Sequence, residues 1–251
     1  KIFGEEMTPD AYKIKRDIGV IFQEVAVFEE LTVYENIDYF CGLYINDRKK
    51  RKQLVEEAIA FVGLEDYRKI RPKKLSGGLL RRLNIACGIA HKPRLIILDE
   101  PTVAVDPQSR NRILEGIQQL NRQGSTIIYT SHYMEEVEQI CSRIAIMDHG
   151  RSIAVGTKEQ LTGMIKTGEK VTIEAVVLSE EQLAGIRELP HVFAVDYQND
   201  ILTVQCTKAR HNLVRILHCL EEQGTAFGRV YSELPTLNDV FLEITGKQLR
   251  D

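Results

Sequence analysis

The chain has 251 residues, of which 43% are hydrophobic and 27% charged, as is ordinary for a globular protein of one large domain or two smaller ones. A formal net charge of −3 supplies no general basic field, so we expect no nucleic-acid partner. Five scattered cysteines without metal-ligand spacing indicate reduced thiols in a cytoplasmic protein. Because no apolar stretch is long enough to span a bilayer, any association with a membrane is expected to come through a partner.

The first part of the chain predicts two short strands joined by a polar connection. Residues 1–6 are typical of the end of a strand, and residues 7–16 form a polar connection with some helical character. Ile18–Phe22 predicts a short buried strand with Gln23 at its carboxyl end. A single glutamine in that place is usually a loop residue.

Two helices are predicted next. Thr32 and Glu35 form a capping box that opens the first helix, which continues through residues 36–43. The second helix covers residues 49–61. A basic run over residues 48–52 opens it, but the run is short and acidic residues follow, so we interpret it as a solvated helix face.

Ser76-Gly77-Gly78 precedes a further helical run. The apolar positions of this run have helical spacing, and they are Leu79, Leu83, Ala86 and Ala90. Ser76 is placed near the N-cap, and two glycines there let a bulky anion approach the backbone N–H groups, where the helix dipole favours a phosphate. Taken alone, the tripeptide is more often an ordinary loop before a helix.

Leu95–Leu98 is a run of four aliphatic residues, typical of a parallel strand buried on both faces. Asp99 and Glu100 follow at its carboxyl end, where open α/β sheets place their ligands, and Pro101 ends the pairing. Because successive strand residues point in opposite directions, Asp99 can face a hydrated Mg²⁺ while Glu100 faces an attacking water. The alternative is a buried strand that ends in two surface acids.

A second helix and strand follow these acids. Residues 109–123 predict an amphipathic helix that Gly124 ends, and residues 126–130 predict a second buried strand. His132 comes just after this strand, where a histidine is usually a satisfied loop residue. Beyond it the chain predicts a helix over residues 133–141, a hairpin of residues 143–148 and 151–155, and a helix capped by Thr157 and Gln160.

The remaining residues predict strands and helices in the order βαββαβ and a last helix. The strands cover residues 171–177, 192–197, 201–206 and 226–233, the helices residues 179–189 and 208–223, and the last helix residues 236–245. This order is that of the ferredoxin-like split unit.

Three of these stretches together resemble the motifs of ABC ATPases. Leu75-Ser76-Gly77-Gly78 resembles their signature motif, residues 95–100 resemble their Walker B strand with its catalytic glutamate, and residues 103–106 resemble their D-loop. The resemblance covers essentially the whole chain. It implies an ATP-binding and ATP-hydrolysing subunit that uses Mg²⁺.

The resemblance also implies how the chain is divided. Residues 1–166 form an α/β core of the P-loop NTPase-like ABC ATPase type, truncated at its N-terminus, with a helical subdomain at about residues 31–74 that touches a membrane partner. Residues 167–251 form a small C-terminal α+β domain of the ferredoxin-like type, which we interpret as a regulatory or dimer-contact module.

Individual roles follow from the same resemblance. Glu100 is the catalytic glutamate that polarises water, His132 is the switch histidine that steadies the γ-phosphate, and Asp99 serves Mg²⁺. The residues expected to bind the nucleotide or its metal are Ser76, Gly77, Gly78, Gln23 and Asp106. The signature of one subunit is expected to close over a nucleotide held by a second ATPase subunit, in a homodimer or a heterodimer.

The implied partner is a transmembrane permease subunit of an exporter, which holds the chain at the inner face of the cell membrane. The alternatives are a soluble ABC ATPase that works on ribosomes or DNA, and a non-catalytic binding module derived from the family. Tandem ATPase units or long coiled inserts would favour the soluble type, and the sequence has neither.

Two positions depart from the family pattern. No glycine-rich phosphate loop of the form G-x-x-x-x-G-K-[ST] lies upstream of Gln23, so we expect residues 1–251 to be inactive alone. The stretch from Gly163 to Lys170 only superficially resembles that loop, because Glu169 stands in place of its lysine. Leu79 occupies the position where the family most often has glutamine, and we do not interpret it as inactivating.

Overall fold

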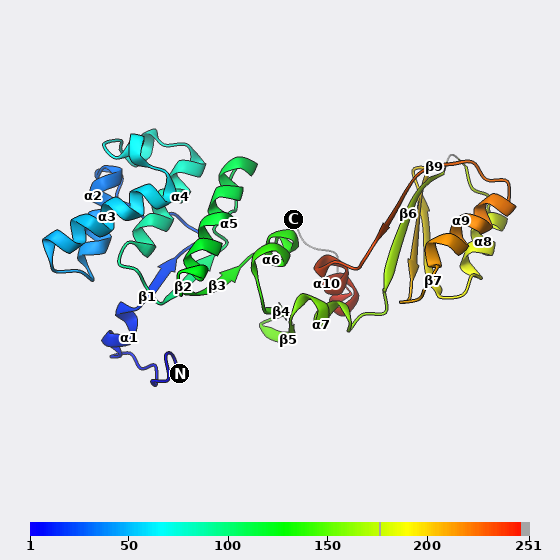
Figure 1. The fold of residues 1–251 in the computed structure, drawn as a ribbon, viewed down its shortest axis with the longest axis horizontal. Coiled ribbons are helices and arrows are strands. Elements are labelled where there is room, and N and C mark those ends of the chain that lie inside the picture. The colour runs from blue at the N-terminus through cyan, green and yellow to red at the C-terminus, as the bar shows by residue number, and fades with distance from the viewer. Residues whose placement is uncertain (176, 247–251) are drawn as a thin grey trace. The chain divides into compact units, whose positions relative to one another are not determined.

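The computed structural model describes residues 1–175 and 177–246. The chain forms two compact units, Lys1–Ile140 and Cys141–Asp251 (Figure 1). This division falls earlier than the predicted boundary between residues 166 and 167, because the hairpin and short helix after Ile140 group with the C-terminal elements. Val176, at the end of a predicted strand, and residues 247–251 lie outside the described residues.

The first unit contains a three-stranded parallel sheet with the order β1-β2-β3. Its strands are β1 (Ile18–Ile21), β2 (Leu95–Asp99) and β3 (Thr126–Thr130). Ile21 pairs with Leu98, and Leu98 pairs with Tyr129. All three carboxyl ends therefore meet at one edge of the sheet. The sequence predicted each of these strands at nearly the same residues.

The predicted burial of β3 is wrong. Its residues alternate between exposed and half-buried, and Ile128 is 48% exposed. Among the described residues β3 pairs with β2 on one side only, so its apolar composition indicated a strand but not how many neighbours cover it. Residues 1–6 also differ from expectation, since they form a turn closed by an isolated bridge between Ile2 and Glu5.

The first unit also contains helices and short turns. They are α1 (Tyr12–Arg16), α2 (Val33–Gly42), α3 (Arg48–Val62), α4 (Gly77–Ile89), α5 (Pro107–Arg122) and α6 (Met134–Ile140), with short 3₁₀ turns η1 (Glu65–Tyr67) and η2 (Pro72–Lys74). The capping box of Thr32 and Glu35 opens α2 as predicted. Gly63, with a φ of 66°, ends α3 in the left-handed conformation that favours glycine.

Two glycines bring α4 directly onto β1. A Cβ at Gly19 would lie 2.4 Å from the carbonyl oxygen of Gly88, and a Cβ at Gly88 would lie 2.7 Å from the side chain of Ile21. No side chain fits between the helix and the strand at this point. The C-terminal end of α4 is therefore fixed to β1, the strand that leads to Gln23.

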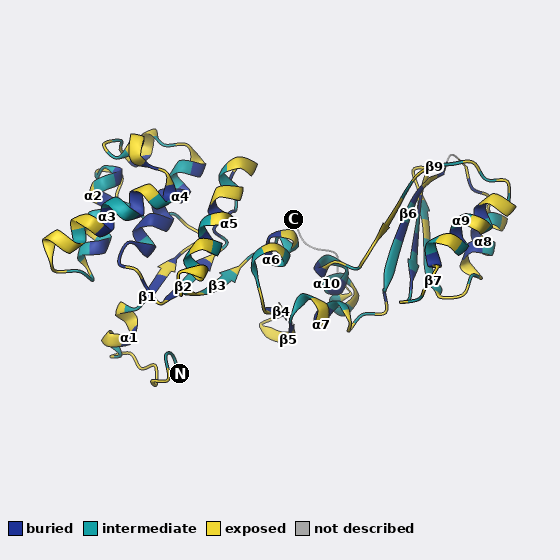
Figure 2. Ribbon diagram, viewed as in Figure 1, coloured by how far each residue is buried: buried dark blue, intermediate teal, exposed yellow. Residues whose placement is uncertain are grey.

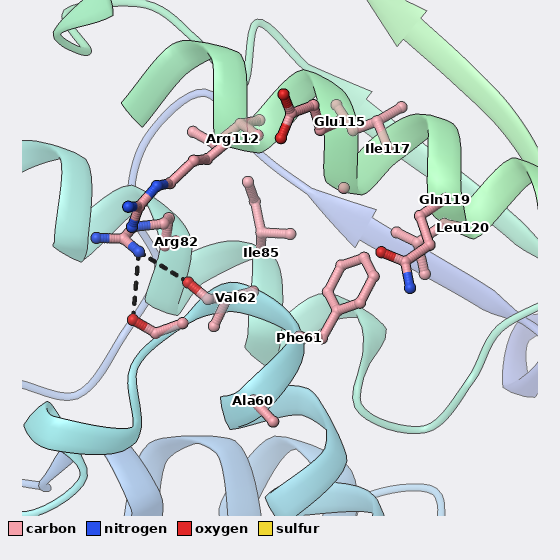
Figure 3. Close-up of a pocket in the computed structure, with 13 residues that line it drawn as sticks. Ala60, Phe61, Val62, Arg82, Ile85, Arg112, Glu115, Ile117, Gln119 and Leu120 are labelled. Atoms are coloured by element: carbon pink, nitrogen blue, oxygen red, sulfur yellow. Dashed lines mark hydrogen bonds between the residues drawn. The ribbon is translucent and has the colours of Figure 1, made fainter. Parts of the chain in front are cut away.

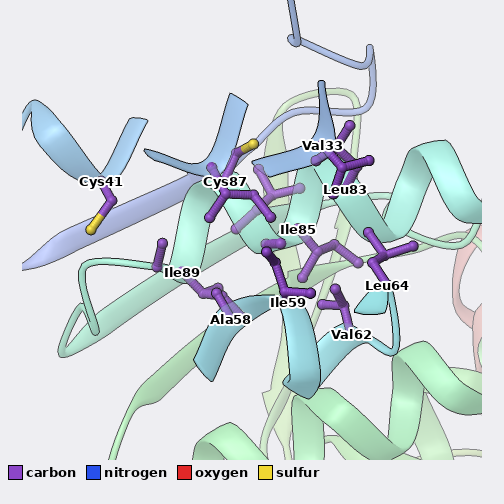
Figure 4. Close-up of a cluster of buried hydrophobic side chains, with 14 of the residues drawn as sticks. Val33, Cys41, Ala58, Ile59, Val62, Leu64, Leu83, Ile85, Cys87 and Ile89 are labelled. Atoms are coloured by element: carbon purple, nitrogen blue, oxygen red, sulfur yellow. The ribbon is translucent and has the colours of Figure 1, made fainter. Parts of the chain in front are cut away.

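An apolar cluster joins α2, α3 and α4 to β1 and β2 (Figure 4). Ile37, Ile59, Leu83 and Leu98 are at most 1% exposed. Full burial of such a side chain stabilises the fold by about 1.5–3 kcal/mol before the entropy cost is subtracted. The buried positions lie on the inner sides of these helices, and their outer sides are exposed (Figure 2).

The second unit begins with an antiparallel hairpin of β4 (Ile144–Asp148) and β5 (Arg151–Gly156). His149 and Gly150 form its turn with positive φ values of 47° and 73°, which suits a two-residue hairpin loop. The helix α7 (Lys158–Thr162) follows, and the last helix, α10 (Leu237–Thr245), packs against it. The predicted hairpin and both predicted helices are present.

A four-stranded antiparallel sheet makes up the rest of this unit, with the order β7-β8-β6-β9. Its strands are β6 (Glu169–Ala175), β7 (Val192–Gln198), β8 (Ile201–Cys206) and β9 (Phe227–Glu233). The helices α8 (Glu180–Arg187) and α9 (Asn212–Glu222) pack on it through an apolar cluster that includes Ile173, Ile186 and Leu220 (Figure 1). The second of these helices begins later than residue 208, where the sequence predicted its start.

Membrane-spanning helices and disulfide bonds are both absent from the described part of the chain. No helix in residues 1–175 and 177–246 is long and apolar enough to cross a membrane. All five cysteines are free thiols, and burial raises the pKa of Cys41 and of Cys206 to about 11.

Candidate functional site at the carboxyl edge of the sheet

Polar side chains gather where β2 and β3 end. Asp99, the last residue of β2, pairs with Thr130, the last residue of β3. Glu100 and His132 lie just beyond these two residues on the same edge. The Nδ1 atom of His132 lies 3.2 Å from Oε1 of Glu100, and the two side chains are 45% and 26% exposed. The structure thus brings the two predicted catalytic residues into contact and leaves them open to solvent.

Glu100 has a strained backbone. Its φ is 44°, a left-handed value that costs a residue other than glycine roughly 1–3 kcal/mol and is found preferentially at functional sites. The backbone N–H of Glu100 donates to the carbonyl oxygen of Thr130 at 3.2 Å and to its Oγ1 at 3.1 Å. These bonds hold the backbone of Glu100 in its strained conformation.

Asp99 is oriented by the same threonine. Oγ1 of Thr130 donates to Oδ1 of Asp99 at 2.6 Å, and the remaining lone pairs of the aspartate face solvent. No group of three or more His, Cys, Asp or Glu side chains in the described residues could hold a metal by itself. Mg²⁺ is usually held through one or two carboxylates together with water and substrate phosphates. The donor set at Asp99 fits that kind of site.

Gln23 lies near this edge, and its loop is held by side chains of α4. It is exposed and follows β1, the strand next to β2. The carbonyl oxygen of Phe22 accepts from Nη1 of Arg81 at 3.2 Å and from Nδ2 of Asn84 at 3.3 Å. The amide oxygen of Asn84 in turn accepts from the backbone N–H of Ala26 at 3.1 Å. Two side chains of α4 therefore fix the loop that carries Gln23.

Sequence reasoning missed Thr130, Arg81 and Asn84 as supporting residues. Arg81 and Asn84 are 7% and 5% exposed, although both are polar and belong to a helix assigned by its apolar periodicity. Buried polar groups require partners. Polar residues on the inner face of α4 were therefore the sequence signal that could have identified these supporting residues.

The Ser76 motif opens α4 as predicted. Oγ of Ser76 accepts from the backbone N–H of Leu79 at 3.3 Å, which makes it the N-cap. A Cβ at Gly78 would lie 2.5 Å from Oγ of Ser109 and 3.0 Å from Oδ2 of Asp106. Glycine is required at this position by packing within the chain, whereas Ser76 and Gly77 are exposed.

Asp106 caps α5. Its Oδ1 accepts from the backbone N–H of Ser109 at 2.9 Å, and this bond is the main cause of its lowered pKa. Its other carboxylate oxygen is the atom that lies near Gly78. The structure therefore places the predicted D-loop aspartate against the signature helix and gives its side chain a helix-capping contact.

A surface pocket of about 220 Å³ lies away from these residues, between α4, α5 and the end of α3 (Figure 3). None of the predicted site residues lines it. Nη1 of Arg82 donates to the carbonyl oxygens of Val62 and Gly63 at 2.9 and 3.3 Å, and burial is the main cause of the lowered pKa of Arg82. Because this guanidinium satisfies the last carbonyls of α3, we interpret it as a structural contact.

Comparisons with known proteins identify relatives of this chain. The family description "ABC transporter" matches residues 1–103. A linearmycin resistance ATP-binding protein of Bacillus subtilis (strain 168) is 39% identical over 99% of this chain and 80% of its own length. A daunorubicin resistance ATP-binding protein of Streptomyces coeruleorubidus is 31% identical over 100% of this chain and 79% of its own length.

A solved structure described as the ATP-binding subunit of an ABC transporter shares the fold. Its TM-score is 0.54 at 24% sequence identity, over 60% of this chain and 62% of the other.

Proposed function

We propose, on the premise that this chain belongs to the ABC transporter family of ATP-binding subunits, that it hydrolyses ATP with Mg²⁺ and so drives export through a separate membrane subunit. The observation that carries this proposal is the contact of Glu100 with His132 at 3.2 Å, beside an aspartate that Thr130 orients. Phosphoryl transfer needs positioning and electrostatic stabilisation more than covalent chemistry, and this edge of the sheet offers both.

Each side chain at the edge has a distinct proposed role. Glu100 orients the attacking water and accepts its proton, since a carboxylate within hydrogen-bond reach of that water can act as a general base. His132 donates a hydrogen bond to the γ-phosphate and is steadied by Glu100. Asp99 and Gln23 hold Mg²⁺, which when bound neutralises charge on the phosphate oxygens.

The exposed end of α4 is proposed to act on a second subunit. Ser76 and Gly77 present a helix N-terminus to solvent, and helix N-termini favour phosphate. Asp106 and Gly78 fix the orientation of this end within the chain. In a dimer of ATPase subunits, the signature of one would close over the nucleotide of the other.

The export direction and the membrane partner rest on the relatives. Both relatives are named for resistance to an antibiotic or drug. We therefore propose a transmembrane permease partner, a location at the inner face of the cell membrane, and an antibiotic-like small molecule as the exported substrate. The helical region at residues 31–74 is the proposed contact with the permease.

We retain the division at residues 166 and 167 as a proposal for the functional domains. The apolar cluster of the four-stranded sheet begins at Val171, and among the described residues it includes none from β4, β5 or α7. The strand order β7-β8-β6-β9 with antiparallel pairing supports a ferredoxin-like fold for residues 167–251. Its proposed role is regulation or dimer contact.

Turnover of the Glu100→Gln variant tests the proposal. Residues 1–251 contain no glycine-rich phosphate loop and are proposed to be inactive alone, so the assay uses the protein assembled with its permease in membrane vesicles. Loss of a general base is expected to lower phosphate release about 10²–10⁴-fold, while ATP binding is kept. Removal of Mg²⁺ with a chelator should abolish turnover of the unmodified protein.

Glu135→Gln is the matched control, because Glu135 is an exposed carboxylate in α6. It should release phosphate at the rate of the unmodified protein. Turnover of Glu100→Gln within a few fold of that rate would remove Glu100 from its proposed role.

A further inference from the structure

Glu136 is a buried carboxylate that the proposed chemistry does not use. It lies in α6 and is 4% exposed. A carboxylate is costly to bury unless hydrogen bonds or an ion pair compensate for lost hydration. The groups around Glu136 therefore show how its burial is compensated and which segments it holds together.

Three hydroxyl groups converge on one oxygen of Glu136. Its Oε2 atom accepts from Oγ1 of Thr102 at 2.7 Å, from the phenol of Tyr129, and from Oγ of Ser131 at 3.3 Å. The three donors come from different segments: Thr102 from the turn after β2, Tyr129 from β3, and Ser131 from the loop after β3. One side chain thus binds the ends of both strands that form the candidate site.

The other oxygen of Glu136 is the first member of a series of contacts that ends at His132. Nε of Arg110, in α5, lies 3.3 Å from Oε1 of Glu136, close enough for an ion pair. The guanidinium carbon of Arg110 lies 4.7 Å from the ring centroid of Tyr133. The ring centroids of Tyr133 and His132 are 4.2 Å apart. A continuous series of contacts therefore runs from Glu136 to the imidazole.

Glu100 and His132 are both close in sequence to residues that hydrogen-bond to Glu136. Thr102 is two residues after Glu100, and the backbone N–H of Val103 donates to the Glu100 carbonyl at 3.3 Å. Ser131 directly precedes His132, and its Oγ accepts from the backbone N–H of Tyr133 at 3.0 Å. Weakening the bonds to Glu136 would free both loops together.

We propose that Glu136 is a positioning residue that joins the turn after β2 and the loop after β3 into one unit and so keeps Glu100 and His132 in register. This inference rests on the proposed function for its effect on turnover. The coupling of the two loops itself does not depend on the proposed function and can be measured in residues 1–251.

Amide hydrogen exchange of residues 1–251 tests the coupling without any need for activity. Glu136→Gln keeps the shape of the side chain but removes its charge, and Glu135→Gln makes the same charge change one residue away on an exposed side chain. We expect exchange to become about ten- to a hundredfold faster in both loops, residues 100–106 and 131–133, the range for loss of a hydrogen bond to a charged group. Glu135→Gln should leave both loops unchanged.

Two results of this exchange experiment would overturn the coupling. One is faster exchange confined to α6, with both loops at their original rates. The other is faster exchange in a single loop, since Glu136 would then support that loop alone.

Turnover of a double variant separates positioning from mere stability. In Glu136→Gln the charge of Arg110 loses its partner, so the melting temperature should fall. Adding Arg110→Met removes the unpaired charge and should restore much of the melting temperature. Because Thr102 and Ser131 still lack the carboxylate, kcat should stay at least about tenfold low, with KM for ATP within about twofold.

Recovery of kcat together with the melting temperature would show that Glu136 acts on stability alone. The unmodified protein and Glu100→Gln are assayed in parallel. If Glu100→Gln turns over normally, the proposed function fails, while the exchange result on the two loops still decides whether Glu136 couples them.

Discussion

The sheet of the first unit ends in charged, partly exposed side chains, whereas the sheet of the second unit is covered by apolar ones. At the first edge, Thr130 links Asp99 to Glu100, and Glu100 contacts His132. In the second unit, buried residues such as Ile173 and Leu202 are fully shielded from solvent and pack with α8 and α9. The first arrangement leaves polar atoms available for a ligand. The second buries apolar side chains and so contributes to stability.

Residues other than glycine with positive φ values occur in both units. In the second unit, Asn199 and Asp200 have φ values of 52° and 61° in the turn of the β7–β8 hairpin, where both residue types are common. Glu100 and Ala104 have φ values of 44° and 57°, and neither residue type favours that conformation. Phe3 and Lys92, which lie away from the site, also have positive φ values of 53° and 54°, so such strain includes the candidate site but is not confined to it.

The largest effect expected in this comparison is on the stability of each unit. Leu83 and Leu202 are both fully buried, one in each apolar cluster. Replacing either with alanine should lower the free energy of unfolding by about 2–5 kcal/mol. Calorimetry should show that Leu83→Ala shifts the transition of the first unit and Leu202→Ala that of the second. An identical shift of one common transition in both variants would contradict separate cores.

A pair of threonine variants sharpens the functional contrast. Thr130→Val removes the hydroxyl that orients Asp99 and Glu100, and loss of such a supporting contact typically costs about 10–100-fold in metal affinity or activity. Thr203→Val makes the same change in β8, and its effect on stability should stay within about 0.5 kcal/mol. In an ATP turnover assay titrated with Mg²⁺, Thr203→Val should match the unmodified protein, whereas Thr130→Val should be slower. Denaturant unfolding measures the stability of both variants. Equal turnover of the two variants would remove Thr130 from the site.

A substitution in the signature tests which subunit it serves. Ser76→Arg places a long cation at the exposed end of α4. It should weaken nucleotide-dependent dimer formation by roughly tenfold or more, equivalent to about 1.4 kcal/mol, because Ser76 is proposed to contact the nucleotide of the other subunit. Nucleotide affinity of the monomer should stay within about twofold. An equal loss in both titrations would place Ser76 in the site of its own chain.

The smallest effect is a pH dependence of the first unit. His91 is 9% exposed, stacks on Tyr44 at 3.8 Å and lies 3.2 Å from the carbonyl oxygen of Ile18. Burial is the main cause of its lowered pKa. The unfolded chain binds a proton at this histidine below about pH 6.5, while the folded chain resists it. Stability should therefore fall as the pH drops through that value.

His91→Phe should flatten this slope, whatever the variant costs at neutral pH. Denaturant unfolding between pH 5 and pH 8 measures the slope in both proteins. Parallel curves for the two proteins would assign the acid sensitivity to other groups.

Local rules account for most of what was predicted correctly. The capping boxes at Thr32 and Thr157 both formed, since a box depends only on residues three apart in sequence. The strand of Leu95–Asp99 and the placement of Asp99 and Glu100 at its end follow from a run of aliphatic residues with two acids after it. The family resemblance then selected Gln23 and His132, which no local pattern distinguishes from loop residues.

The sequence by itself determined where helices and strands form and which motifs end them, because periodicity, caps and turn residues act over a few positions. Tertiary structure alone decided the exposure of β3, the contact of Glu100 with His132, and the support that Thr130, Arg81 and Asn84 give to the site. Each of these depends on segments far apart in the chain meeting at one edge of a sheet. Their partners are set by strand order and by the close approach of α4 to β1, which no short stretch of sequence encodes.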